Sequence, residues 1–239
     1  MGFNFDGGLA SKLTIGANGK YDIDIHIQGI AAHAGLRPQE GVSAIAIAGI
    51  AIADLQRNGW LGRIERNKES GVSNIGIILG GSATNVVAES AAIKAEVRSH
   101  DPGFRRQIVD AYRKAFEDAA SSVHNAEGQV GSIQFQAQPF YEAYRLNENE
   151  PCIAIAEAAV RSIGGEPIHT VTDGGIDANW INAHGIPMVS LGCGQEKIHT
   201  IEETLYLPEF HKACRIALLL ATASEEPEVT SVQVSKAVR

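Results

Sequence analysis

The stretch from Thr172 to Glu203 reads TDGGIDANWINAHGIPMVSLGCGQEKIHTIEE, and it predicts the fold of the C-terminal part of the chain. It indicates a glycine turn, a short amphipathic helix over residues 178–183, a Gly-Ile-Pro stop and a buried strand over residues 188–191. A glycine-rich loop then presents His199 just past the end of that strand. Because open α/β sheets bind ligands outside the carboxyl ends of their strands, we expect a site at His199.

Polar side chains cluster on the loops around this predicted strand. They are Asp173, Asp177, Asn179, His199, Glu202 and Glu203. Loops on a rigid scaffold often carry binding and catalytic residues, which favours a functional site. Local chemistry also permits a second interpretation, in which Asp177 and Asn179 only cap the helix and His199 is an ordinary surface histidine.

The motif GGIDANWINAHGIP, followed by IHTIEE, resembles the C-terminal catalytic segment of a family of co-catalytic zinc exopeptidases. That family includes peptidase T, carboxypeptidase G, aminoacylase and succinyl-diaminopimelate desuccinylase, and its peptidase T-like members are the most similar. The resemblance implies that His199 is a zinc ligand and that Asp177 and Asn179 belong to a substrate-binding turn. Ile176 stands where the family usually has Thr or Ser, so the resemblance supplies no hydroxyl at that position.

The composition indicates a globular protein with one large domain or two small ones, since the 239 residues are 44% hydrophobic. The net charge of −8, with acidic and basic residues interspersed, argues against a nucleic-acid partner. No stretch approaches about 18 uninterrupted apolar residues, so we expect no membrane partner. Three cysteines without CxxC spacing are typical of a reducing compartment, and we expect the cytoplasm.

The first residues, GFNFDGG, are typical of the end of a strand that leads into Asp6 and a double glycine. Asp-Gly is common turn chemistry, which gives Asp6 an ordinary structural interpretation. The resemblance implies more, because family members carry an Asp or Glu zinc ligand at this place, just before the chain enters a second domain. Asp6 matches that ligand.

Residues 20–138 carry the pattern of a small domain in the order βαββαβ. We expect strands over residues 20–28, 72–79, 91–97 and 132–136, helices over residues 42–57 and 104–121, and a polar loop over residues 58–70. This order predicts a ferredoxin-like sheet with two helices on one face. Asp22, Asp24 and His26 alternate with isoleucines in the first strand, and we interpret them as its solvated face and not as a metal site.

The loop after that strand, GIAAHAGLRPQEGVSAI, contains His33. Its residues alone predict a loop histidine and nothing more. The loop resembles the lid signature of the same family, which implies that His33 reaches into the partner subunit's active site and helps to stabilise the tetrahedral intermediate. Asn85 and Arg98 match positions that contact substrate, Arg98 through a carboxylate. The alternative for Arg98 is a surface ion pair with Asp101.

Beyond Pro139, apolar strands alternate with helices over residues 151–163 and 208–224, which indicates part of an α/β sheet. The overall fold class is therefore α/β with an α+β lid. We divide the chain into a strand end and crossover at 1–19, a ferredoxin-like lid and dimerisation domain at 20–138, the C-terminal part of an α/β zinc-exopeptidase catalytic domain at 139–225, and a flexible tail at 226–239.

The family site holds two zinc ions and needs about five or six protein ligands and a general base. The resemblance covers about residues 1–225, which corresponds to the C-terminal two-thirds of a family member, and supplies Asp6 and His199 alone, one for each zinc. We therefore expect a fragment, a truncated reading frame or half of a split enzyme that binds zinc weakly or not at all by itself.

The strands predicted at residues 168–171 and 188–191 are apolar on both faces, as is typical of parallel strands covered by helices. If the missing half supplies that cover, an apolar surface is left on the catalytic sheet. We expect Phe3, Phe5, Val189 and Leu191 to belong to that surface.

The resemblance implies a zinc-dependent exopeptidase of the peptidase T type that acts on short peptides and forms a homodimer through the lid. A separate N-terminal half would be a further partner. Two alternatives stay open: a non-catalytic dimerising or binding protein derived from the family, and another amide hydrolase of the family, such as a dipeptidase, aminoacylase or desuccinylase.

Overall fold

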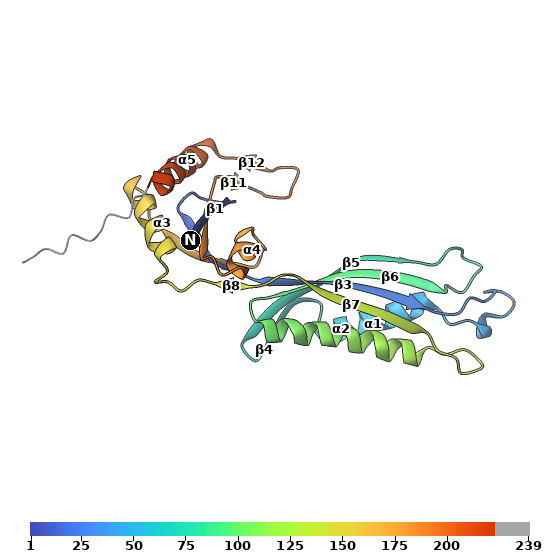
Figure 1. The fold of residues 1–239 in the computed structure, drawn as a ribbon. Coiled ribbons are helices and arrows are strands. Elements are labelled where there is room, and N and C mark those ends of the chain that lie inside the picture. The colour runs from blue at the N-terminus through green and yellow to red at the C-terminus, as the bar shows by residue number, and fades with distance from the viewer. Residues whose placement is uncertain (223–239) are drawn as a thin grey trace, which may run out of the picture.

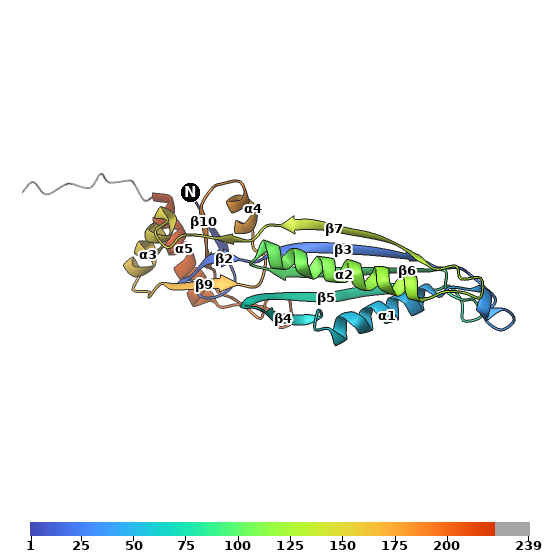
Figure 2. The same cartoon turned by 90° about the horizontal axis from the view of Figure 1, so that it is seen from below.

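The computed structural model describes residues 1–222 and contains two large β-sheets with separate helices (Figure 1, Figure 2). We call β3–β7, α1 and α2 the lid half, and the other elements the site half. Two stretches connect the halves, because the chain passes from β2 into β3 and returns from β7 into β8. Figure 1 shows the lid half as an elongated body that extends to one side of the site half.

The lid sheet has the strand order β4-β5-β6-β3-β7, and all neighbouring strands are antiparallel. Its strands are β3 (Gly19–Gln28), β4 (Gly62–Arg66), β5 (Glu69–Gly80), β6 (Ser90–Ser99) and β7 (Ser132–Tyr141). The helices are α1 (Ala44–Arg57) and α2 (Pro102–Ser122), with a 3₁₀ turn, η1 (Pro38–Glu40), before α1. Figure 1 shows both helices on the same face of the sheet.

The alternation of β3 explains which face the helices cover. Ile23, Ile25 and Ile27 are at most 2% exposed and share one core with both helices.

Each helix begins at a side-chain cap, since Ser43 accepts a hydrogen bond from the Ala46 N–H (3.2 Å) and Asp101 accepts one from the Phe104 N–H (2.6 Å).

The predicted ferredoxin-like lid is confirmed, and the structure adds one strand to it. β4 forms a hairpin with β5 inside the stretch predicted as a polar loop. Its sequence, GRIER, buries Ile64 alone, so it lacks the apolar alternation by which a half-buried strand is detected. Asn67 and Lys68 form the hairpin turn with φ values of 50° and 72°, as tight hairpin turns require.

The site half contains a mixed sheet. β1 (Gly2–Asp6) is parallel to β10 (Met188–Gly192), which is antiparallel to β2 (Lys12–Ala17). β2 is in turn parallel to β9 (Ile168–Thr172) and pairs at its end with the short β8 (Tyr144–Arg145). The remaining elements are α3 (Pro151–Ser162), α4 (Ala178–Ala183), the ribbon β11 (Gln195–Glu196) with β12 (Thr204–Leu205), and α5 (Leu207–Thr222).

Two expectations about this half are wrong. β9 and β10, expected from their apolar composition to be parallel strands, run in opposite directions on either side of β2. Val189 and Leu191 are at most 1% exposed, because β10 lies between β1 and β2 and belongs to a core with α3 and α5. Phe3 and Phe5 are partly buried against the same core. Exposed apolar side chains lie on β9 and α4 instead: Ile168, Val171 and Trp180.

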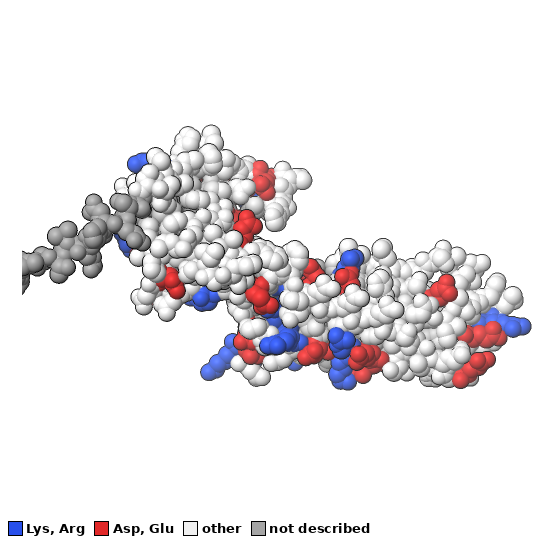
Figure 3. All heavy atoms as spheres, viewed as in Figure 1, with Lys and Arg blue, Asp and Glu red and all other residues white. Residues whose placement is uncertain are grey.

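The predicted tail at 226–239 lies outside the described residues. Among the helices within residues 1–222, none is long and apolar enough to cross a membrane. Figure 3 shows one face of the molecule, on which acidic and basic side chains are intermixed over the lid half and form no basic stripe.

Candidate active site

Asp6 is the last residue of β1 and lies beside Gly192 at the end of β10. Its Oδ1 accepts a hydrogen bond from the Gly7 N–H (2.6 Å), and its carbonyl accepts one from the Cys193 N–H (2.7 Å). A Cβ on Gly192 would lie 2.0 Å from the Leu9 carbonyl oxygen. Glycine at 192 therefore lets the turn after Asp6 cross close to β10.

His199 lies on the loop between β11 and β12 in a left-handed conformation, with φ of 64°. Such a φ is uncommon for a residue other than glycine and persists where surrounding contacts impose it. Here the Glu203 carboxylate accepts a hydrogen bond from the His199 N–H (2.8 Å), and Lys197 forms an ion pair with Glu202 (2.7 Å). The loop thus holds its shape through its own side chains, and His199 remains exposed.

Asp6 and His199 line one cavity of about 450 Å³. The wall between them includes Lys12 and Thr14 of β2 and the loop from Gly174 to Asp177. Segments from opposite ends of the chain therefore meet beyond the ends of β1 and β10, where sheets of this kind bind ligands.

A carboxylate oxygen and an imidazole nitrogen are ordinary zinc donors, but two donors do not fill the coordination of a metal ion. Among residues 1–222, no group of three His, Cys, Asp or Glu side chains is placed to hold a metal. Asp6 and His199 could therefore supply two donors to a metal site, but among residues 1–222 they do not make a complete one.

Asp177 and Asn179, which follow β9, point in different directions: one lines the cavity and the other is buried. Asp177 lines the cavity together with Ile176, and its side chain makes no capping hydrogen bond to α4. Asn179 is fully buried: its Oδ1 accepts from the Ile176 N–H (2.9 Å) and its Nδ2 donates to two carbonyl oxygens. Its amide hydrogens are thus used inside the protein, whereas Asp177 is free to face a ligand.

Arg98 lies near the end of β6 that adjoins the site half. Its guanidinium makes two hydrogen bonds to Glu96 (3.0 and 3.1 Å), and Lys20 also reaches Glu96 (3.3 Å). Burial would raise the pKa of the Glu96 carboxyl, but the hydrogen bonds from Arg98 and Lys20 outweigh it and lower that pKa. Arg98 is therefore in an ion pair, with Glu96 in place of the alternative partner Asp101, which caps α2.

His33 and Asn85 lie together at the far tip of the lid. The Ala34 N–H donates to the Asn85 carbonyl (2.9 Å), and His33 Nδ1 accepts from the N–H groups of Gly35 and Leu36 (3.2 Å each). With Nδ1 an acceptor, the hydrogen of a neutral ring is on Nε2, which can donate to a ligand. Figure 1 shows the tip of the lid well away from the site half, so these two residues do not join Asp6 within one chain.

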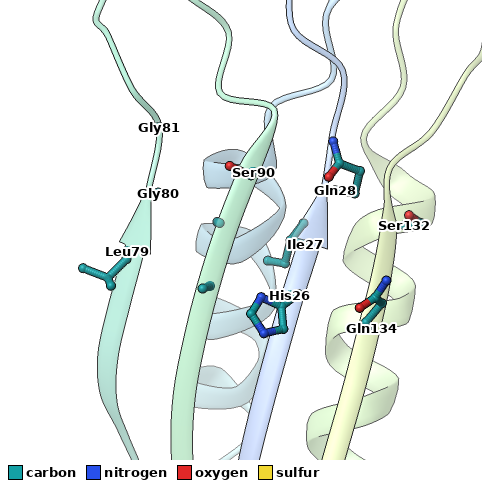
Figure 4. A pocket seen from close by; sticks show the side chains of 11 residues that line it. His26, Ile27, Gln28, Leu79, Gly80, Gly81, Ser90, Ser132 and Gln134 are labelled. Atoms are coloured by element: carbon teal, nitrogen blue, oxygen red, sulfur yellow. The ribbon is translucent and has the colours of Figure 1, made fainter.

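The uncovered face of the lid sheet holds a polar hollow of about 550 Å³ that sequence reasoning missed (Figure 4). Its lining includes His26, Gln28, Ser90, Ser132 and Gln134. The expectation that the wet face of β3 is solvated is confirmed, since helices lie behind the sheet and this face is open. The alternation of β3 marks such a face, but the hollow depends on how four strands twist side by side.

Comparisons with known proteins find a family model and solved structures that are similar to this chain. Residues 15–124 match the family described as peptidase dimerisation domain. A tripeptidase from Staphylococcus aureus is 33% identical, with a TM-score of 0.81 over 92% of this chain and 56% of that chain. Aminopeptidase PepT from Bacillus cereus is 32% identical, with a TM-score of 0.77 over the same shares, 92% and 56%.

A more distant structure shares the fold alone: YXEP of Bacillus subtilis, a dinuclear metal-binding peptidase of the M20 family, is 20% identical with a TM-score of 0.62 over 92% of this chain and 55% of that chain. The chain covers 54% of a curated relative with which it is 32% identical, so it spans about half the length of such relatives. The resemblance seen in the sequence is confirmed, since the chain carries an M20 peptidase dimerisation domain within residues 15–124 and is similar to a tripeptidase and to aminopeptidase PepT over 92% of its length.

Proposed function

We propose that this chain is the lid and the C-terminal catalytic part of a zinc-dependent exopeptidase that cleaves short peptides in the cytoplasm. The observation that carries this proposal is the meeting of Asp6 and His199 at one cavity, beside the loop from Gly174 to Asp177. Similarity to a tripeptidase and to an aminopeptidase supports peptides as the substrate class.

Asp6 and His199 would serve different metal ions of the complete site. When bound there, zinc supplies a Lewis acid and an activated water. Since the described residues provide two donors, these side chains need further ligands from another polypeptide segment. Asp177 would accept a hydrogen bond from the substrate at the cavity wall.

Arg98 would bind a substrate carboxylate through its planar guanidinium, which suits two parallel hydrogen bonds. To do so, it must exchange the Glu96 carboxylate for that of the substrate, and Glu96 then keeps Lys20 as its partner. The exchange makes the affinity for a carboxylate depend on Glu96 as well as on Arg98.

His33 would donate a hydrogen bond from Nε2 to the carbonyl oxygen of the scissile bond as negative charge develops there. Asn85 lies beside it and would contact the same substrate. Because the tip of the lid lies far from the cavity of its own chain, a second copy must supply both residues.

A homodimer through residues 20–138 would meet this requirement. β4 pairs with β5 from Glu69 to Ser73, so the remaining part of β5 is a free edge among the described strands. This edge carries the exposed apolar residues Ile77, Ile78 and Leu79, and α1 exposes Ile45 and Ile50. An unpaired edge strand with apolar neighbours favours pairing with a second copy.

The test combines zinc titration with tripeptide hydrolysis by the full chain. We expect weak zinc binding by calorimetry, reduced in Asp6→Asn and in His199→Ala and abolished when both are changed, and no turnover. His184→Ala is the matched control, because His184 is an exposed histidine that bonds to the Trp180 carbonyl away from the cavity lining. Equal zinc affinity in all variants would refute the ligand assignment, and zinc-dependent turnover lost in His199→Ala would show that the chain needs no further segment.

A non-catalytic dimeric binding protein is the second candidate, favoured by the lack of a third metal donor among residues 1–222. Addition of the N-terminal segment of the Staphylococcus aureus tripeptidase distinguishes the two. Restored tripeptide cleavage supports the enzyme, and tight peptide binding without cleavage supports the binding protein. Testing dipeptides, N-acyl amino acids and N-succinyl compounds in the restored assay distinguishes the other amide hydrolases.

A further inference from the structure

Asn179 lies in the first turn of α4, directly after the loop that borders the cavity, and its side chain points into the protein. It is 0% exposed, and its amide makes three hydrogen bonds. Oδ1 accepts from the Ile176 N–H (2.9 Å), while Nδ2 donates to the carbonyl oxygens of Asn18 (2.9 Å) and Glu142 (2.8 Å). Both hydrogens of the amide group are therefore engaged with the backbone.

The two carbonyls lie on the two connections between the halves of the molecule. Asn18 stands between β2 and β3, where the chain enters the lid half, and Glu142 stands between β7 and β8, where it returns. The side chain of Asn179, next to the cavity loop, thus bonds to the backbone of both connections.

Other contacts fasten the same loop to the same connections. The Asn18 amide donates to the Asp173 carbonyl, and the Asn18 N–H donates to the Thr172 carbonyl (3.3 Å). Gly175 packs against the ring of Tyr141, where a Cβ would come within 2.1 Å of the ring. Loop residues 172–179 therefore have little freedom to move unless residues 17–19 and 141–143 move with them.

We propose that Asn179 is a positioning residue that locks the cavity loop to both connections, so that the orientation of the lid half and the shape of the cavity change together. The proposed function enters only through the choice of this cavity as the active site. The role replaces substrate contact by Asn179, because its amide has no hydrogen left for a ligand.

Asn182 provides a matched control on the same short helix. Its Nδ2 donates to the carbonyls of Ala178 (2.8 Å) and Met188 (2.9 Å), and its Oδ1 accepts from the Met188 N–H (3.2 Å). It makes the same number of bonds as Asn179, but all of them stay within the site half. Loss of either amide removes the donor to two backbone carbonyls, so the two variants differ mainly in where the lost bonds lead.

The experiment compares Asn179→Ala with Asn182→Ala in the full chain, by amide hydrogen exchange and small-angle X-ray scattering. In Asn179→Ala we expect exchange about tenfold faster or more over residues 17–20, 141–145 and 172–178, since two bonds to the connections are lost. We also expect a broader distribution of interatomic distances, because the lid half takes more orientations. In Asn182→Ala we expect faster exchange over residues 178–190 alone and an unchanged distance distribution.

The same changes in both variants, or no change at the connections in Asn179→Ala, would overturn the proposal. If Asn179→Ala does not fold, amide exchange of the Asn18→Ala variant tests the proposal instead. It removes the side-chain bond to the Asp173 carbonyl while keeping the Asn18 backbone. Faster exchange over both residues 141–145 and 172–178 supports the lock, and faster exchange at residue 18 alone refutes it. No readout uses zinc, peptide or turnover, so failure of the lock leaves the proposed function intact, and the reverse also holds.

Discussion

The two halves of the molecule differ in how much of their structure is built from neighbouring sequence. The lid half is one continuous segment with a core of twenty-two buried apolar residues beneath a five-stranded antiparallel sheet. The site half combines both ends of the described chain, and its core has thirteen such residues. The lid half is therefore organised as a self-contained unit, whereas the site half depends on contacts between distant segments.

Both halves expose apolar side chains. In the lid half Ile45, Ile50, Ile77, Ile78 and Leu79 lie along one free strand edge and the neighbouring helix α1, while Leu36, Val130 and Phe140 are exposed elsewhere. In the site half they occur on β9, on α4 and on the loops and helix after Gly194: Ile168, Val171, Trp180, Ile198, Ile201, Leu205, Tyr206 and Leu218. We expect several of these residues to be covered by the segment that completes the catalytic domain.

Truncation of a large side chain in the lid core should give the largest difference in stability between the two halves. Phe116 is 0% exposed, and Phe116→Ala is expected to cost the lid half about 3–5 kcal/mol. The two tryptophans report on one half each, Trp60 in the lid and Trp180 on α4. Urea unfolding is followed by fluorescence with one tryptophan at a time. In a Trp180→Phe background, Trp60 should report a lower free energy of unfolding for the lid half. In a Trp60→Phe background, Trp180 should report an unchanged free energy of unfolding for the site half. Equal shifts at both tryptophans would mean that the halves unfold as one unit.

Amide exchange of the unmodified chain should show that the site half opens more easily than the lid half. Because the site half has a smaller core and exposes apolar side chains on several elements, we expect the free energy of opening in residues 144–222 to be about 2–3 kcal/mol below that in the lid half. Addition of a segment that completes the catalytic domain should protect residues 144–222 and leave the lid unchanged. Equal protection of both halves in the isolated chain would contradict the interpretation of this half as incomplete.

The lid was predictable because its elements follow one another and carry clear periodicity. The alternation of β3 and the apolar face of α2 are local signals, and neither depends on distant residues. β4 was missed because a short edge strand of charged residues, with Ile64 alone buried, has the composition of a loop. The turn at Asn67 and Lys68 was the signal that could have identified it.

The candidate site was predictable in part. A resemblance of short motifs indicated Asp6 and His199, and the structure brings both to one cavity. The inward direction of Asn179 could not be derived from the motif, because it depends on the backbone carbonyls of Asn18 and Glu142, more than thirty positions away. The burial of Val189 likewise follows from the place of β10 between β1 and β2, which strand composition does not reveal.

A charge on the free edge of the lid should weaken dimers, whereas a charge on the exposed strand of the site half should not. Leu79→Glu places a carboxylate on a residue that is 66% exposed in the single chain and expected to lie at the dimer interface. We expect about 2 kcal/mol of lost association, or roughly thirtyfold in Kd, by sedimentation equilibrium. Ile168→Glu on β9 is the control and should leave the Kd unchanged. A monomeric parent chain at micromolar concentration would refute the dimer itself.

The smallest expected effect concerns the contact by which α5 holds the turn after Asp6. The Glu209 carboxylate accepts hydrogen bonds from the Ala10 N–H (2.8 Å) and from Lys212 (2.6 Å). The bond from Lys212 lowers the pKa of Glu209, partial burial opposes this, and the Ala10 N–H lowers it further.

Because the folded-state pKa lies below that of an unfolded glutamate, about 4.3, the carboxylate stabilises the fold above that pH. Its contribution is lost as the pH falls through the folded-state pKa. We expect Glu209→Gln to cost about 1 kcal/mol at pH 7, with faster exchange over residues 7–12, and to cost progressively less as the pH falls below about 4.3. Urea unfolding at pH 7 and over a series of acidic pH values, followed through Trp180, measures the difference. A cost that does not depend on pH would show that the shape of the side chain, and not its charge, holds the turn beside Asp6.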